Sequence, residues 1–315
     1  MSAFEPDRGV MICGHGSRDT GAVAEFNDTV AMIRERLAPR PVESGFLEFA
    51  RPIISEGLGK LRDQGVRRID AVPGMLFAAG HVKNDVPSVL NQFAHDHEGL
   101  EVRFGRDLGI EPRLLELAKK RIEQALADRT ALPREDTLLA VIGRGTSDSD
   151  ANGNIAKVAR MLWEGLNFPH AVVGFSGVAH PRVDACLQQA VRLGFKRIIV
   201  FPYFLFTGVL VRRIYTQTDE VAASYPEVEF VKAPYLGVHN LVVDSFIDRI
   251  NGIESGDTNM NCGLCKYRTQ IIGFESAVGA PQVGHHHHVE GIGTDHDHGH
   301  DHGHHHHHDH KPREH

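Results

Sequence analysis

The sequence predicts an α/β protein in which one domain, a parallel sheet covered on both faces by helices, occurs twice in tandem. Two observations predict this fold. Short apolar runs alternate with amphipathic stretches of helical length, which is the pattern of parallel strands joined by helical crossovers. The second half of the chain also repeats the first half. A chain of 315 residues is long enough for two domains of ordinary size.

The repeat keeps its register over nearly the whole of each half. Its first part matches Gly14, Gly16 and Asp19 with Gly143, Gly145 and Asp148. Later matches pair Pro73 with Pro202, Leu108-Gly109 with Leu236-Gly237, and Arg121-Ile122 with Arg249-Ile250. Because chance does not hold one register over so many residues, the chain is a tandem duplication.

The strands of the first half are its short apolar runs, expected near residues 10–13, 42–47, 68–73 and 100–104. The helices are expected near residues 22–37, 52–64, 82–93 and 112–126. In the first of them, Val23, Phe26, Val30, Ile33 and Leu37 share one side. The second half repeats this order from Thr137 to about Ile250, after a linker around Pro133.

These patterns divide the chain into four parts. We expect an N-terminal domain at residues 1–130, a C-terminal domain at 131–252, a linker with a Met-x-Cys-x-x-Cys segment at 253–284, and a His-rich tail at 285–315. The tail is His, Asp and Gly with almost no apolar residue, so it is expected to be disordered.

Composition excludes several classes of protein. The formal net charge of −7 argues against a nucleic-acid binder that works by neutralising phosphates. No apolar stretch reaches the length of a membrane span. Four cysteines without a secretory leader favour a reducing cytoplasm. We therefore expect a cytoplasmic protein with no nucleic-acid or membrane partner.

Three ionisable residues follow the first three strands of the first half. His15 lies in the glycine-flanked turn after the first strand, Glu48 follows the second, and His81 follows the third. In open α/β sheets, ligands bind at the carboxyl ends of the strands. Taken singly, His15 could be a solvated or locally bonded side chain, Glu48 a solvated loop acid, and His81 a helix cap.

The duplication favours a shared site for these three residues. Their counterparts in the second half are Arg144, Gly177 and Val209, although the scaffold glycines and prolines are kept in both halves. Repeats diverge where only one copy works, so we expect the site in the first half and little effect from substituting Arg144 or Val209.

Two imidazoles and a carboxylate suit a divalent transition metal such as cobalt, nickel, iron or zinc. A neutral imidazole is also a competent proton acceptor. A closed structural zinc site would need four ligands, usually with local spacing. The scattered positions of His15, Glu48 and His81 therefore indicate an open site that exchanges its metal.

The motifs at these positions resemble a known family. His15-Gly16-Ser17-Arg18, Gly45-Phe46-Leu47-Glu48 and Gly80-His81-Val82 look like those of the sirohydrochlorin chelatases, which are class II chelatases. The tandem halves, the Cys-x-x-Cys segment and the His-rich tail together resemble the long, two-domain sirohydrochlorin cobaltochelatases of cobalamin biosynthesis.

This resemblance implies two Rossmann-like domains, each with a parallel four-stranded sheet, and a tetrapyrrole cleft between them. It implies that His15 and His81 bind Co²⁺ and take protons from the pyrrole nitrogens, with Glu48 assisting. No nucleotide motif is present, so ATP-independent insertion of Co²⁺ into sirohydrochlorin is expected. Iron or nickel insertion is an alternative, and a metal store or metallochaperone is the non-enzymatic one.

Sirohydrochlorin carries many carboxylates, so cationic and hydroxyl side chains are its expected partners. The candidates are Ser17, Arg18, Arg51 and Lys83 in the first half and Arg212 and Arg213 in the second. The alternative for each arginine is a solvated surface charge.

The C-terminal region carries two further metal motifs. Cys262 and Cys265 could form a redox dithiol, half of a zinc site or part of an iron–sulfur site, and Cys13 and Cys186 are expected inside the sheet layers. The resemblance implies a 4Fe–4S cluster completed by a second subunit, so the chain is expected to be a monomeric pseudo-dimer or a homodimer through this segment.

Most of the 22 histidines lie between His285 and His315. This tail favours metal holding, with an affinity tag at His304–His308 as the alternative.

Overall fold

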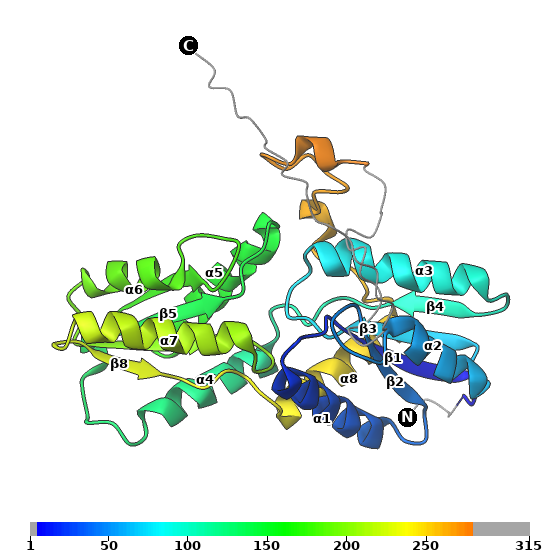
Figure 1. Cartoon of the computed structure of the whole chain (residues 1–315), viewed down its shortest axis with the longest axis horizontal. Coiled ribbons are helices and arrows are strands. Elements are labelled where there is room, and N and C mark those ends of the chain that lie inside the picture. The colour runs from blue at the N-terminus through cyan, green and yellow to red at the C-terminus, as the bar shows by residue number, and fades with distance from the viewer. Residues whose placement is uncertain (1–4, 280–315) are drawn as a thin grey trace, which may run out of the picture.

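The computed structural model describes residues 5–279, which form two α/β units and a C-terminal segment that stands above them (Figure 1). In the first half the elements are β1 (Arg8–Gly14), α1 (Thr20–Leu37), β2 (Val42–Phe46), α2 (Ile54–Asp63), β3 (Arg68–Pro73), a π-helical turn η1 (His81–Asp85), α3 (Val86–Asp96), β4 (Glu101–Phe104) and α4 (Pro112–Leu126). The predicted tail at 285–315 lies outside the described residues.

The second half repeats this order. A short turn η2 (Arg134–Asp136) leads to β5 (Thr137–Gly143), α5 (Ser149–Gly165), β6 (His170–Phe175), α6 (Val183–Val191), β7 (Arg197–Pro202), α7 (Val209–Ser224), β8 (Glu229–Lys232) and α8 (Asn240–Ser255). Two short turns, η3 (Cys262–Leu264) and η4 (Glu275–Ala277), follow in the C-terminal segment.

Each half contains one parallel four-stranded sheet, in the orders β2-β1-β3-β4 and β6-β5-β7-β8. This confirms the predicted fold class. In the first sheet Cys13 is in register with both Gly45 of β2 and Pro73 of β3. The loops that follow these three strands therefore start from one edge of the sheet, where the sequence places His15, Glu48 and His81.

The two halves exchange their last helices. Helix α4 packs against α5, β8 and α8, whereas α8 packs against α1 and β3 of the first half. Arg121 of α4 donates to the carbonyl oxygen of Leu236 at 2.6 Å, and Arg249 of α8 donates to that of Leu108 at 2.7 Å. The repeat preserves these residues because each exchanged helix is anchored to a loop of the other half.

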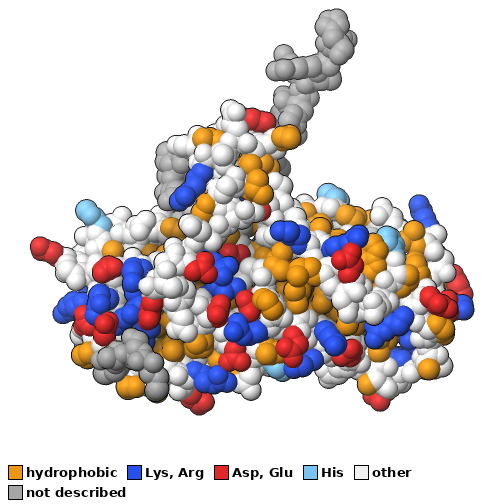
Figure 2. Space-filling view, turned by 180° about the vertical axis from the view of Figure 1, so that it is seen from behind, with side chains coloured by type: hydrophobic (Ala, Val, Ile, Leu, Met, Phe, Trp, Pro, Cys, Tyr) orange, Lys and Arg blue, Asp and Glu red, His pale blue; other side chains and the backbone are white. Residues whose placement is uncertain are grey.

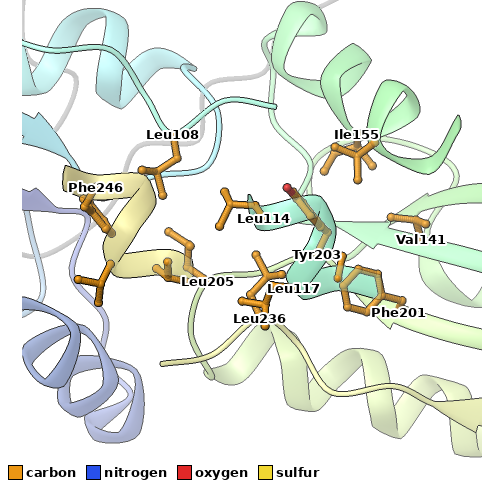
Figure 3. Close-up of a cluster of buried hydrophobic side chains, with 14 of the residues drawn as sticks. Leu108, Leu114, Leu117, Val141, Ile155, Phe201, Tyr203, Leu205, Leu236 and Phe246 are labelled. Carbon is orange, nitrogen blue, oxygen red and sulfur yellow. The ribbon is translucent and has the colours of Figure 1, made fainter. Parts of the chain in front are cut away.

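The exchange joins the halves through one apolar core. A single cluster of buried side chains runs from Leu108 and Phe246 at one end, through Leu205 and Leu114, to Phe201 at the other (Figure 3). Two smaller clusters fill the other face of each sheet. The predicted domain limits at residues 130 and 252 remain predictions, since each spatial unit contains one helix from the other half.

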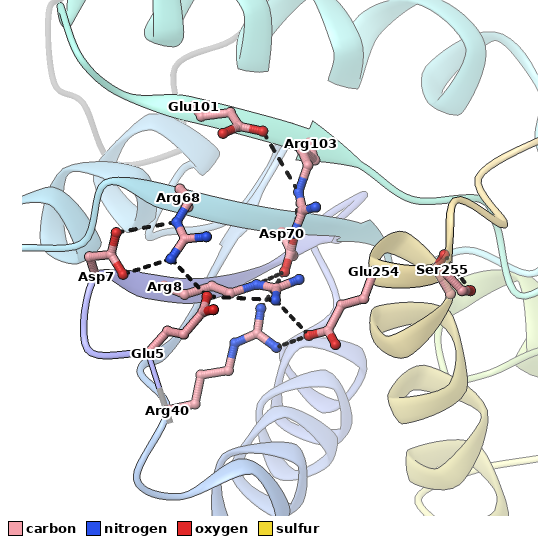
Figure 4. A network of polar contacts seen from close by, with 11 residues as sticks. Glu5, Asp7, Arg8, Arg40, Arg68, Asp70, Glu101, Arg103, Glu254 and Ser255 are labelled. Carbon is pink, nitrogen blue, oxygen red and sulfur yellow. Dashed lines mark hydrogen bonds and ion pairs between the residues drawn. The ribbon is translucent and has the colours of Figure 1, made fainter. Parts of the chain in front are cut away.

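A buried ion-pair network holds α8 against the first sheet (Figure 4). Asp70 of β3 is only 1% exposed and pairs with Arg8 at 2.8 Å, with Arg103 at 2.7 Å and with Arg40. Arg8 also pairs with Glu254 of α8 at 2.9 Å. A buried carboxylate is tolerated here because three guanidinium groups compensate its charge.

The rear face of the molecule carries acidic and basic side chains intermixed over both units (Figure 2). No helix within residues 5–279 combines the length and the apolar character needed to cross a bilayer.

Candidate functional site

The turn after β1 sets the position of His15. Gly16 has a φ of +95°, and a Cβ there would lie 1.6 Å from the carbonyl oxygen of Glu48, so only glycine fits. The amide of Glu48 donates to the carbonyl oxygen of His15 at 3.0 Å. This bond continues the pairing of β1 and β2 beyond the strands and places His15 beside Glu48.

The structure brings together the three residues that the sequence analysis singled out. His15 Nε2 lies 3.1 Å from His81 Nε2 and 3.4 Å from Glu48 Oε1. Each of the three residues offers one ligand atom, and these atoms all lie within 4.8 Å of one another. Glu48 is 4% exposed, whereas both histidines are partly open to the cleft. Three ligands facing a cleft leave further coordination positions open.

The second nitrogen of each ring has a hydrogen-bond acceptor. His81 Nδ1 lies 2.7 Å from Asp85 Oδ2, and His15 Nδ1 lies 2.9 Å from the carbonyl oxygen of Gly16. Because a carboxylate and a carbonyl only accept, each Nδ1 carries a proton, and in the neutral ring Nε2 then presents a lone pair. Two lone pairs that face each other at 3.1 Å repel unless a cation or a proton lies between them. Such acceptors behind metal-binding histidines fix the tautomer and orient the ring.

The pKa of His15 is lowered to about 4, mainly by burial and also by the charge of the neighbouring His81, while Glu48 opposes the shift. His15 is therefore neutral at pH 7. A histidine must be neutral to bind a metal ion, so its environment favours the ligand form.

Two adjoining cavities, of about 330 and 220 Å³, flank His15 at the junction of the two halves, and the smaller one also borders His81. Both cavities are lined by His15, Arg144 and Phe204. Phe49 and Phe206 line the larger cavity. Together the cavities have the size and apolar lining of a small-molecule site.

Two of the six predicted substrate-binding residues line this cleft. Ser17 lines the larger cavity, and its hydroxyl accepts a bond from the amide of Asp19 at 3.0 Å. Arg18 lines the same cavity and lies over the ring of Phe49, with 5.1 Å between its guanidinium carbon and the ring centroid.

The other four predicted residues do not line the two cavities. Arg51 pairs with Glu56 at 3.3 Å, Arg212 pairs with Asp19 of the other half, and Arg213 is exposed on α7. Lys83 is buried and pairs with Asp148 at 2.8 Å and Asp150 at 3.4 Å. The structure therefore gives Lys83 a contact between the halves.

Two residues of the site were not predicted from the sequence. Asp85 orients His81, and its spacing four residues after His81 on one helical turn was the available signal. Arg144 was read only as a lost counterpart of His15, but it lines both cavities. The protein around Arg144 lowers the pKa of its guanidinium by desolvation, and Glu48 acts in the opposite direction.

The Cys-x-x-Cys segment does not complete a metal site within the described residues. Cys265 is buried and Cys262 is partly exposed, whereas Cys13 and Cys186 lie inside the sheet layers as predicted. Between residues 5 and 279, no other histidine, cysteine or carboxylate joins Cys262 and Cys265 in a group of three. These two thiols do not by themselves fit a 4Fe–4S cluster, and a cluster shared with a second subunit stays a prediction.

Comparisons with known proteins support the fold and the duplication. The family model described as CbiX matches the chain twice, at residues 9–125 and 138–253. A sirohydrochlorin cobaltochelatase of Priestia megaterium is 36% identical over 266 residues, which cover 84% of this chain and 86% of that protein.

A sirohydrochlorin ferrochelatase of Priestia megaterium is 28% identical over 234 residues, covering 74% of this chain and 85% of that protein. The structure of SirB from Bacillus subtilis with Fe³⁺ superposes with a TM-score of 0.69 at 24% identity, covering 81% of this chain and 99% of that one. This structural likeness shows a shared fold.

Proposed function

The chain belongs to the CbiX family, and we propose that it inserts Co²⁺ into sirohydrochlorin, without ATP, in cobalamin biosynthesis in the cytoplasm. The observation that carries the proposal is the group formed by His15, Glu48 and His81 at the junction of two cavities. These three side chains form a metal-binding face, and the cavities beside them are large enough to hold part of a macrocycle.

The metal ion is a substrate here, and three protein ligands would hold it. The Nε2 atoms of His15 and His81 would bind it with Glu48, and Asp85 would keep the His81 ring in place. Three ligands leave positions open, so the metal can bond to pyrrole nitrogens before it leaves the protein.

Insertion of a divalent metal displaces two pyrrole protons from the macrocycle. As the metal moves to the ring nitrogens, the Nε2 lone pairs of His15 and His81 become free to accept these protons, and Glu48 lies 3.4 Å from His15 to assist. Because burial lowers the pKa of His15, an imidazolium formed there passes its proton on to solvent water. The apolar walls, including Phe49 and Phe206, would hold the ring against the metal face.

Cobalt is proposed because the cobaltochelatase relative is the more similar of the two compared, at 36% against 28% identity. Two histidines and a carboxylate do not by themselves select cobalt, because the affinities of divalent first-row metals follow the same order at most sites of this kind. Iron and nickel therefore belong in the same assay.

The test follows the absorbance of sirohydrochlorin mixed with Co²⁺, Fe²⁺ or Ni²⁺, with and without protein. Acceleration over the metal alone supports the enzyme. His15→Ala and His81→Ala should each slow the reaction about 10²–10⁴-fold. The control is His95→Ala, at an exposed position of α3. If the protein binds the metal stoichiometrically but does not accelerate its insertion, the result favours a metal-storage protein instead.

A further inference from the structure

Arg144 occupies, in the second half, the place that His15 occupies in the first. Each residue comes directly after the last residue of its strand and is followed by a glycine with positive φ, Gly16 at +95° and Gly145 at +79°. A Cβ on Gly145 would lie 1.9 Å from the carbonyl oxygen of Gly177, the counterpart of the Glu48 contact. The same turn therefore presents His15 and Arg144 to the cleft from the two halves.

The Arg144 guanidinium has no acidic partner within residues 5–279. It donates a long hydrogen bond to the carbonyl oxygen of Gly145 at 3.5 Å. Its own half offers Gly177 and Val209 where the first half has Glu48 and His81. Glu48 is the acidic group whose charge acts on Arg144.

A metal ion bound by His15, Glu48 and His81 would neutralise the negative charge of Glu48. Two neutral imidazoles and one carboxylate around a divalent cation leave a net positive charge, and Arg144 adds another beside it. A cleft with this charge attracts an anionic ligand and orients it. A guanidinium binds carboxylates through two parallel hydrogen bonds, which fixes geometry as well as charge.

We propose that Arg144 binds a carboxylate of the tetrapyrrole and so fixes the macrocycle over the metal-binding face formed by His15, Glu48 and His81. This inference rests on the proposed function. Among the described residues that line the smaller cavity, Arg144 is the one lysine or arginine. Because it also lines the larger cavity, a carboxylate bound to it lies where the two cavities meet.

The experiment compares Arg144→Gln and Arg144→Lys with the unaltered full-length protein. Sirohydrochlorin binding is measured by fluorescence quenching, Co²⁺ binding by calorimetry, and turnover by absorbance. We expect Arg144→Gln to weaken sirohydrochlorin binding and raise KM by about 10- to 100-fold, the range of a charge-assisted hydrogen bond. Arg144→Lys should recover part of the loss, and Co²⁺ affinity should not fall.

A chemically altered substrate isolates the carboxylate. Sirohydrochlorin with its carboxylates converted to amides should bind the unaltered protein and Arg144→Gln equally. Arg192→Gln, an exposed change at the end of α6, controls for the loss of one positive charge.

Three results would overturn the inference. An unchanged KM in Arg144→Gln would show that Arg144 does not touch the substrate. If Arg144→Gln binds Co²⁺ more tightly and keeps the same KM, Arg144 acts on the metal instead. If Arg144→Gln weakens binding of the amide substrate as much as binding of sirohydrochlorin, Arg144 does not recognise a carboxylate. Failure of the unaltered protein to bind or metallate sirohydrochlorin would reject the proposed function itself.

Discussion

At the scale of single residues, the hydrogen bond behind His81 matters as much as the ligand atom. Asp85 Oδ2 accepts from His81 Nδ1 at 2.7 Å, while its Oδ1 accepts from Asn84 at 2.7 Å. Asp85→Asn should lower Co²⁺ affinity about 10- to 100-fold, because the amide leaves the imidazole less basic and less firmly oriented. Calorimetric titration with Co²⁺ measures this.

Asp96→Asn is the matched control for Asp85→Asn, since Asp96 lies at the exposed end of α3 and accepts from Gln92. Equal Co²⁺ affinities in Asp85→Asn and the unaltered protein would show that Asp85 does not support the ligand.

The protonation of His15 gives a second prediction. Its pKa of about 4 lies below the ordinary 6.5, mainly because burial disfavours the imidazolium. The folded protein therefore binds fewer protons than the unfolded chain between these values. The corresponding stability is complete above pH 6.5 and is lost as the pH falls through about 4.

We expect the His15 signals in nuclear magnetic resonance spectra of the metal-free protein to titrate with a midpoint near pH 4. His15→Gln assigns those signals and should flatten the dependence of unfolding free energy on pH between 6.5 and 4. A His15 midpoint near 6.5 would contradict this account of the site.

At the scale of elements, Lys83 connects the turn that carries His81 to the second half. Lys83 and Asp148 are each 4% exposed in their side chains, and Asp148 also caps α5 by accepting from the amides of Asp150 and Ala151. Removing Lys83 leaves Asp148 buried without its cation. Lys83→Met should therefore lower the free energy of unfolding by about 3–5 kcal/mol.

Urea unfolding of Lys83→Met and Lys196→Met separates this role from substrate binding. Lys196 pairs with Asp136 while 66% exposed, so its loss should cost under about 1 kcal/mol. If Lys83→Met is as stable as Lys196→Met but raises KM for sirohydrochlorin, the substrate role predicted from the sequence is the right one.

Local sequence patterns predicted the elements well and their long-range contacts poorly. Apolar runs located the strands, and the divergence between repeats located His15, Glu48 and His81, because each signal lies within a few residues. The pairing of Lys83 with Asp148 joins residues far apart in the chain, so no local pattern reveals it. The place of Arg144 in the lining of both cavities was not predicted either, because its alignment with His15 shows only that a ligand type is missing.

At the scale of the whole molecule, the helix exchange makes the two halves one folding unit. The buried face of α4, formed by Leu114, Leu117, Ala118 and Ile122, packs toward the second half, while α8 covers β3 and α1 of the first. The cleft lies between the halves, so the exchange also holds its two walls at a fixed separation. The preserved pairs Arg121–Leu236 and Arg249–Leu108 mark this exchange in the sequence, although the sequence alone does not reveal that they cross between halves.

A fragment of residues 1–130 tests the exchange. Alone it would leave the apolar face of α4 in water and the place of α8 on β3 empty, so a folded monomer is disfavoured. Because α4 and α8 are equivalent in the repeat, α4 of one copy can occupy the α8 position on a second copy, which makes a swapped dimer. Sedimentation should therefore show a dimer whose dissociation is coupled to unfolding.

Arg121→Glu should weaken that dimer by losing the bond that corresponds to Arg249–Leu108. A fragment that is monomeric and folded at all concentrations, with or without Arg121→Glu, would show that α4 can close its own half and that the exchange is not needed for folding.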